Sequence, residues 1–140
     1  MRILSGLAAL LMLVGLVGAE PKTLNPENNW VGIVNDEKLA KQAPESGIIA
    51  DAKTFEKLWK SWRKDEKLPP VDFTKQIVVV TLSVGGPNRP AISATLDDAG
   101  DLKILARSTL IAGDAFGYSL ATFDRKGIKS VNGKKVPEAK

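Results

Sequence analysis

The stretch Val71-Asp72-Phe73-Thr74-Lys75-Gln76-Ile77-Val78-Val79-Val80-Thr81-Leu82-Ser83 joins a short polar turn to a strongly hydrophobic segment. Residues 77–82 are nearly all apolar and mostly β-branched, without the alternation of a half-exposed strand. This pattern predicts a strand in the middle of a sheet, covered on both faces. Asp72 stands where its side chain can hydrogen-bond the backbone two residues later, which predicts a fixed turn before the strand.

One amphipathic helix is predicted ahead of this strand. Asp51 is a suitable N-cap, because its side-chain oxygen can accept from the free N–H groups of the first turn, and the helix runs from Ala52 to about Trp62. Four large apolar residues have the i, i+3, i+4, i+7 spacing of one helix face: Phe55, Leu58, Trp59 and Trp62. We expect this face to cover the sheet, with Trp62 as the best candidate for partial exposure.

The remaining elements are predicted to be short strands joined by turns. Residues 30–34 indicate an edge strand, residues 36–42 a helical turn, and residues 92–96 and 102–106 a hairpin across 97–101. Further strands are predicted at 118–123, 128–131 and 134–136, the last two joined by Asn132-Gly133, a signal for a type I′ turn. The predicted fold is α+β, an antiparallel-rich sheet of about six strands with one main amphipathic helix packed on it.

The N-terminus indicates export. Met1-Arg2 is followed by an apolar segment and by Val17-Gly18-Ala19, which predicts a signal peptide over residues 1–19 that is cleaved before Glu20. The alternative is an uncleaved anchor, although residues 3–19 are shorter than the roughly 20 residues of a spanning helix. The chain has no cysteine, which excludes disulfides, thiolate metal sites and lipid attachment through a cysteine. We expect a periplasmic or extracellular protein with no membrane contact after cleavage.

The rest of the chain is predicted to form one domain. Cleavage leaves 140 − 19 = 121 residues, which is enough for a single core. Residues 20–46 are predicted as a lead-in, loosely held over 20–29 and containing the edge strand, and residues 47–136 as the main α+β domain, which forms one unit with 30–46. Residues 137–140 are predicted as a tail, and the protein is expected to be a monomer.

The charge pattern argues against a nucleic-acid partner. The chain has 20 basic and 16 acidic residues, and only Arg2 lies in the predicted leader, so 19 − 16 = +3 remains after cleavage. The charges are interspersed, and no run of like sign reaches the five or six residues of a binding tail. This pattern is typical of a solvated surface.

The residue inventory also argues against most catalytic classes. Histidine is absent, which excludes Ser-His-Asp and Cys-His catalysis and histidine-bound zinc. We therefore predict a non-catalytic protein with no cofactor and no metal. Two alternatives are a small hydrolase using carboxylates such as Asp72 and Asp114, and a calcium- or small-ligand-binding domain. The weak candidates for calcium ligands are Asp97, Asp98 and Asp101, which lack the alternating spacing of a calcium loop.

Three segments together resemble the PrcB C-terminal-like domains, which are small exported bacterial modules. They are Phe55-x-x-Leu58-Trp59 on the predicted helix, Pro70-Val71-Asp72-Phe73 before the central strand, and the turn Gly86-Pro87-Asn88-Arg89-Pro90. The resemblance covers about Gly47 to Val136 and implies binding or maturation of a partner protease rather than catalysis. The turn of that family typically continues into Thr-Gly-Gly-Tyr, whereas Ala91-Ile92-Ser93 follow here.

Two loops are the candidate binding surface for another exported protein. Residues 108–117 carry Leu110, Ile111 and Phe116, so this loop either folds back over the core or exposes an apolar patch. Arg89 stands in a stiff turn between Asn88 and Pro90, where its guanidinium can engage a carboxylate bidentately. The predicted binding residues are Asn88, Arg89, Leu110, Ile111 and Phe116.

Overall fold

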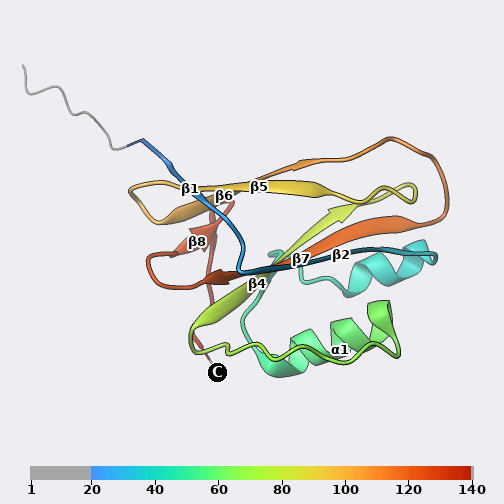
Figure 1. The fold of residues 1–140 in the computed structure, drawn as a ribbon, viewed down its shortest axis with the longest axis horizontal. Coiled ribbons are helices and arrows are strands. Elements are labelled where there is room, and N and C mark those ends of the chain that lie inside the picture. Colours follow the sequence, from blue (N-terminus) through green and yellow to red (C-terminus); the bar gives the residue numbers. More distant parts are fainter. Residues whose placement is uncertain (1–19, 140) are drawn as a thin grey trace, which may run out of the picture.

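The computed structural model describes residues 20–139, in three layers (Figure 1). The predicted signal peptide lies outside the described residues. The first layer contains α1 (Ala52–Arg63) and the 3₁₀ helix η1 (Glu37–Gln42). Next comes a four-stranded sheet, here the helix-covered sheet, in the order β2 (Asn28–Val34), β7 (Phe116–Asp124), β4 (Gln76–Ser83), β3 (Ile48–Ile49).

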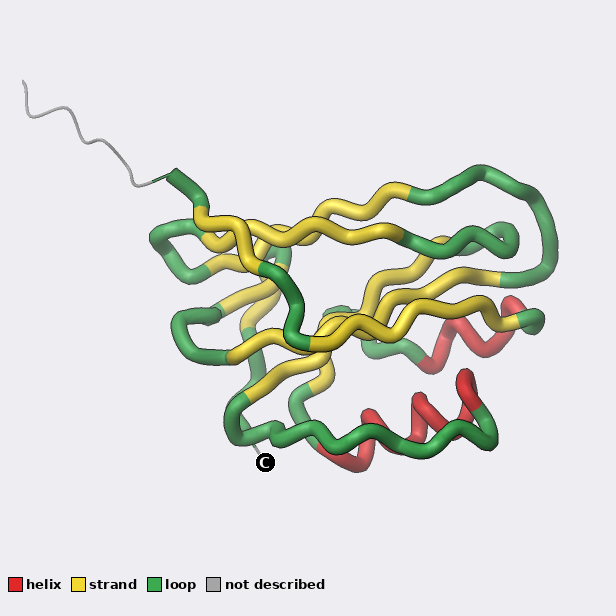
Figure 2. The backbone as a smooth tube through the Cα atoms, viewed as in Figure 1, coloured by secondary structure: helices red, strands yellow, loops and turns green. Residues whose placement is uncertain are grey.

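The third layer is a five-stranded sheet, here the outer sheet. Its order is β1 (Lys22–Leu24), β5 (Ala91–Leu96), β6 (Asp101–Arg107), β8 (Ser130–Val131), β9 (Lys134–Lys135). All strand pairs in both sheets are antiparallel except β6 with β8. Figure 2 shows the two sheets as separate layers of strands with the helices on one side only. The α+β class is therefore confirmed, and residues 20–139 hold nine strands in two sheets where about six in one sheet were predicted.

Strand β4 lies between β7 and β3 and is buried on both faces, as its unbroken apolar run predicts. Val78 and Val80 pack with Phe55 in the cluster under α1, whereas Ile77 and Val79 pack against the outer sheet. The predicted turn before β4 is confirmed. The Thr74 N–H and hydroxyl donate to the Asp72 carboxylate at 3.0 and 2.5 Å.

Helix α1 begins where the sequence predicts. The Asp51 side chain caps its first turn by accepting from the Thr54 N–H at 2.8 Å. The predicted partial exposure of Trp62 is wrong, since only 6% of the residue is accessible. Its ring packs on Phe116 and Tyr118, with centroids 5.1 and 5.0 Å away, and its indole N–H donates to the Leu39 carbonyl. These contacts come from segments distant in sequence, which helix periodicity alone does not reveal.

The N-terminal lead-in is more ordered than predicted. Strand β1 pairs with β5 in register Lys22↔Leu96, and the next strand, β2, pairs with β7 in the other sheet. The chain therefore crosses from one sheet to the other between Leu24 and Asn28. Three residues form a strand here because β5 supplies the partner, and so short a segment has no periodicity of its own.

The turns of the outer sheet gather at one end of the molecule, here the hairpin end, made of residues 97–101 and 130–133. The Asp97 carboxylate accepts from the N–H groups of Ala99 and Asp101 at 3.0 and 2.9 Å. Asn132 and Gly133 have φ values of 48° and 80°, as the predicted type I′ turn requires. No helix within residues 20–139 is long and apolar enough to cross a membrane.

Candidate functional site

Two loops lie side by side at the end of the molecule opposite the hairpin end, at the right of Figure 1. Residues 84–90 connect β4 to β5, and residues 108–115 connect β6 to β7. We call these two segments the loop platform. Their backbones are joined directly, since the Gly86 N–H donates to Ala115 at 2.9 Å and the Gly113 N–H donates to Gly85 at 3.0 Å.

Asn88 is the main link between the two loops. Its side chain is buried, with 3% of the residue exposed. Its Nδ2 donates to the Ile111 carbonyl at 2.7 Å, while its Oδ1 accepts from the Ile111 N–H at 2.8 Å and from the Thr109 hydroxyl at 2.7 Å. Three hydrogen bonds to one buried carboxamide fix the course of the longer loop.

Close backbone packing at two glycines adds to this restraint. A Cβ on Gly86 would lie 1.6 Å from the Ile111 carbonyl oxygen, and a Cβ on Gly117 would lie 1.7 Å from the Asn88 carbonyl oxygen. Both neighbours are backbone atoms that cannot move aside by a rotamer change. The two loops are therefore in direct backbone contact with each other and with β7.

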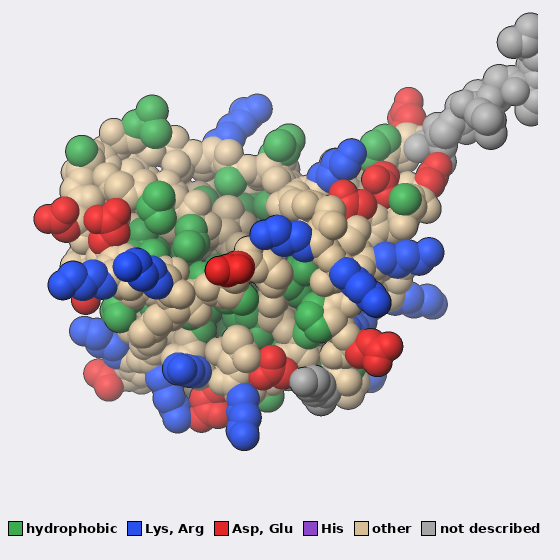
Figure 3. All heavy atoms as spheres, turned by 180° about the vertical axis from the view of Figure 1, so that it is seen from behind, with side chains coloured by type: hydrophobic (Ala, Val, Ile, Leu, Met, Phe, Trp, Pro, Cys, Tyr) green, Lys and Arg blue, Asp and Glu red, His purple; other side chains and the backbone are tan. Residues whose placement is uncertain are grey.

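The platform holds apolar side chains out into solvent. Leu110 is 96% exposed, Ile111 56% and Val84 61%. The predicted alternative in which this loop folds back over the core is therefore wrong for Leu110 and Ile111. Seen from behind, the platform end is at the left of Figure 3, and hydrophobic side chains reach the surface at its upper left.

The other predicted binding residues divide into two kinds. Arg89 is exposed within the first loop of the platform. Phe116, predicted as a contact residue, is instead fully buried as the first residue of β7 and packs against Trp62. Asn88, also predicted as a contact residue, acts inside the platform as its brace. Of the five predicted residues, the structure therefore brings Arg89, Leu110 and Ile111 to the surface.

A second candidate is a polar depression of about 340 Å³ beside β2, which sequence reasoning missed. Its floor is Tyr118, whose hydroxyl accepts from Arg63 Nη1 at 2.9 Å, while Arg63 also pairs with Glu66 at 2.7 Å. Burial raises the pKa of Tyr118, although the nearby Arg63 and Arg89 act to lower it. The phenol is protonated at neutral pH, as a tyrosine ordinarily is, and can donate a hydrogen bond. Lys64 and Arg89 complete the charged rim.

The sequence holds one signal for this depression, because a glycine inside a strand often marks a place where another side chain or backbone packs closely against it. Gly32 lies under the Tyr118 hydroxyl, and a Cβ there would come within 2.5 Å of that oxygen. The absent side chain therefore leaves room for the phenol at the edge of β2. The sequence alone does not show which distant residue fills such a space.

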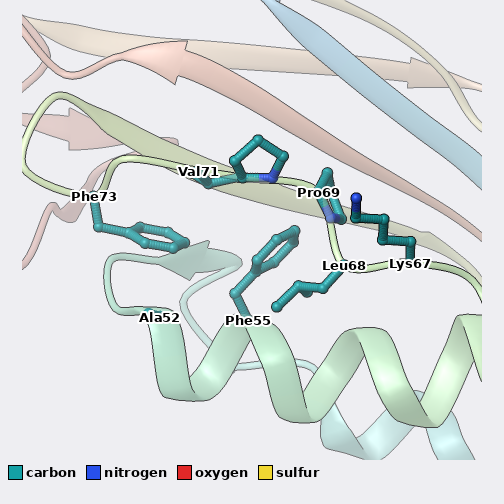
Figure 4. Close-up of a pocket in the computed structure, with 8 residues that line it drawn as sticks. Ala52, Phe55, Lys67, Leu68, Pro69, Val71 and Phe73 are labelled. Atoms are coloured by element: carbon teal, nitrogen blue, oxygen red, sulfur yellow. The ribbon is translucent and has the colours of Figure 1, made fainter.

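A third depression, of about 420 Å³, lies between α1 and residues 67–73 (Figure 4). The rings of Phe55 and Phe73 turn toward each other across it, 5.8 Å apart, beneath Pro69 and Val71. Among its eight lining residues only Lys67 has a charged or polar side chain. It has few groups that could orient a ligand, so we assign it no function.

The carboxylates proposed for hydrolysis do not form a pair. Asp72 lies just before the start of β4 at Gln76. Asp114 lies just before β7, near the point where Gly117 pairs with Ser83, the last residue of β4. A strand of eight residues separates them, on the order of 25 Å, which is too far for glycosidase-type catalysis. Asp72 is also occupied by its turn, and hydrogen bonds from Thr74 lower its pKa.

Two of the aspartates proposed for calcium, Asp97 and Asp101, hold the turns of the hairpin end. Asp97 caps the hairpin turn, and Asp101 accepts from the Ser130 hydroxyl and the Gly133 N–H at 2.7 and 2.9 Å. Within residues 20–139 no group of three or more acidic, histidine or cysteine side chains could hold a metal ion. The structure therefore does not bring Asp97, Asp98 and Asp101 together as a cation site.

No protein-family model matches this chain, and comparison with the curated proteins and with the solved structures finds no match. The resemblance to PrcB C-terminal-like domains stays a prediction from the sequence. What the protein does must therefore be inferred from the chemistry of its own surfaces.

Proposed function

We propose that this protein is a non-catalytic accessory module that binds another protein through the loop platform. The observation that carries the proposal is Leu110, which is 96% exposed on a loop fixed by the buried Asn88. A flexible loop could turn such a side chain inward, whereas this loop is held open by hydrogen bonds. An apolar side chain presented in this way favours contact with a partner.

The energetics of such a contact are favourable for three reasons. Burying a leucine or isoleucine side chain contributes about 1.5–3 kcal/mol, and Leu110 and Ile111 stand next to each other. The braced backbone needs little ordering when a partner binds, which removes a cost that flexible loops carry. Arg89, on the shorter loop of the platform, adds a planar cation suited to a carboxylate on the partner.

The sequence suggests where such a partner would be found. If residues 1–19 are removed as a signal peptide, the module acts in the periplasm or outside the cell, and its partner is another exported protein. The resemblance to PrcB C-terminal-like domains fits a protease partner. We propose that the protein binds as a monomer.

Affinity capture from the envelope fraction of the source cells tests the proposal. The bait is the purified protein, compared with Leu110→Ser/Ile111→Ser and with the control Leu105→Ser, which removes an apolar side chain 71% exposed on β6 outside the platform. We expect proteins that are retained by the wild type and the control and lost from the platform variant. Equal recovery on all three baits, or no specific protein on any, would overturn the proposal.

A further inference from the structure

The outer edge of β2 has backbone groups that no other strand pairs with among residues 20–139, since β2 is the last strand of its sheet. The hydrogen bonds around β4 show which groups these are. Arg125 N–H donates to Lys75 across β4 and β7, and Val80 N–H donates to Gly47 on the β3 side. Odd-numbered residues of β4 therefore bond to β7, and even-numbered ones bond to β3.

The same alternation continues through β7 to β2. In the register Val79↔Ala121, odd-numbered residues of β7 bond to β4, so its even-numbered residues bond to β2. Through the register Gly32↔Tyr118, the even-numbered residues of β2 face β7. The N–H and C=O groups of Val31 and Ile33 therefore point outward, in the pattern that a further strand would use.

Two depressions that share lining residues lie beside this edge. The first is positively charged, whereas Lys64 and Asp36 balance each other in the second. The depression over Tyr118 is lined by Val31 and Ile33, and a second depression of about 290 Å³ shares Ile33, Trp62 and Lys64 with it. Three cations and one anion line the first depression, namely Arg63, Lys64, Arg89 and Glu66, giving 3 − 1 = +2. Since Glu66 already pairs with Arg63, the attraction available to a ligand comes mainly from Arg89 and Lys64.

We propose that the outer edge of β2 binds an extended acidic segment of a partner protein, which adds as a fifth strand to the helix-covered sheet. The Val31 and Ile33 backbone groups hold the segment, and an Asp or Glu side chain on it meets Arg89, Lys64 and the Tyr118 hydroxyl. Main-chain hydrogen bonds supply affinity in this mode of recognition, and the charges supply specificity.

Charge decides against the simplest competing occupant, a second copy of this chain. Two copies paired antiparallel across Gly32 would bring their Arg89 and Lys64 side chains together on the same edge. Like charges opposed across an interface are unfavourable, so the edge is protected from self-association while it stays open to an acidic segment. The site shares Arg89 with the loop platform but uses neither Leu110 nor Ile111, so the proposal can hold even if those two side chains bind nothing.

The direct test is amide hydrogen exchange by NMR with a defined peptide, acetyl-Thr-Val-Thr-Glu-Thr-Val-Thr-amide. In the free protein the amides of Val31 and Ile33 should exchange faster than those of Gly32 and Val34. At saturating peptide we expect both to slow by about tenfold or more, since new hydrogen bonds protect them. No binding, or binding without protection of these two amides, would overturn the proposal.

Two pairs of matched changes separate the backbone and charge contributions. Val31→Pro removes an outward-pointing N–H that β7 does not use, while Val31→Thr keeps it, so only the first should abolish binding. Arg89→Glu should weaken binding by about tenfold or more, whereas Arg107→Glu, the same change at an exposed site on β6, should not.

The peptide itself gives a test that does not depend on how the variants fold. Replacing its Glu by Gln should weaken binding to the wild type, and replacing it by Lys should weaken binding further. Platform variant Leu110→Ser/Ile111→Ser should bind the peptide as the wild type does, which distinguishes this site from the platform. Equal affinity for the Glu, Gln and Lys peptides, or protection of Val31 and Ile33 by self-association of the free protein, would overturn the proposal.

Discussion

At the hairpin end, the Asp97 and Asp101 carboxylates accept backbone N–H groups, and the Asn132 Oδ1 accepts from Ile104. At the platform end, the Asn88 carboxamide accepts from the Ile111 N–H and donates to the Ile111 carbonyl. Both ends are thus held by short side chains bonded to backbone. They differ in that the hairpin end presents polar turn residues, whereas the platform presents Leu110 and Ile111.

This difference shows that the exposed apolar residues do not result from a loose loop. If the platform were simply irregular, its apolar side chains would collapse against the sheet, as Phe116 does at the start of β7. Asn88 instead holds the backbone of Ile111 in a position that keeps Leu110 in solvent. Such a restraint is consistent with a surface that has a partner.

The largest effect should follow from filling the space between the platform and β7. In Gly117→Ala the new methyl would lie 1.7 Å from the Asn88 carbonyl oxygen, so the backbone must shift. We expect a loss of about 3–4 kcal/mol in the free energy of unfolding, measured by urea denaturation. Gly127→Ala is the control, because its φ of 81° carries some strain but its Cβ meets nothing within 4 Å, and it should lose only about 1–2 kcal/mol.

Removal of the brace should have the next largest effect. Asn88→Ala removes three hydrogen bonds at a residue only 3% exposed, which we expect to lower the free energy of unfolding by about 2–3 kcal/mol. Hydrogen exchange should also accelerate at Ile111 and not at the hairpin end. Unchanged exchange at Ile111 would mean that Asn88 does not fix the loop.

The hairpin end offers a smaller, pH-dependent effect. The Ser130 hydroxyl and then the Gly133 N–H lower the pKa of Asp101, so its contribution to stability is complete above about pH 4, the ordinary range of an aspartate, and is lost as the pH falls through the lower value of the folded state. Asp101→Asn should remove this part of the acid dependence and cost less than about 1 kcal/mol at pH 7. Denaturation curves from pH 7 to pH 2 measure both, and an acid dependence identical to the wild type would contradict the assignment.

The smallest effect should come from the exposed residue itself. Leu110→Ser changes a side chain that is 96% exposed, so we expect a change within about 0.5 kcal/mol in stability. Leu105→Ser, on the outer face of β6, should behave alike. A loss above about 1 kcal/mol in Leu110→Ser alone, by thermal or urea denaturation, would show that Leu110 packs on the protein in solution.

Local signals in the sequence predicted the parts of the fold that depend on neighbouring residues. The cap at Asp51, the turn at Asp72 and the Asn132-Gly133 turn are fixed by hydrogen bonds or φ values within a few residues. The unbroken apolar run of residues 77–82 likewise predicted a strand buried on both faces, because each face requires its own apolar set.

Features that depend on distant partners were not predictable. The strand at Lys22–Leu24 exists because β5 lies beside it, and the burial of Trp62 comes from Leu39, Phe116 and Tyr118. The same limit applies to the candidate sites. The loop of residues 108–115 was predicted as a surface of interest, but its outward course depends on Asn88, and the groove beside β2 depends on residues from four segments.

The most direct test of the platform as a binding surface is site-specific photocrosslinking in the source cells. A photoreactive phenylalanine analogue is placed at position 110, with position 105 as the control, since both side chains are exposed but only the first lies on the platform. We predict a discrete crosslinked protein from position 110 that is absent from position 105 and disappears when Asn88→Ala is added. Crosslinks from position 110 that match those from position 105, or none at either, would contradict a binding role for the platform.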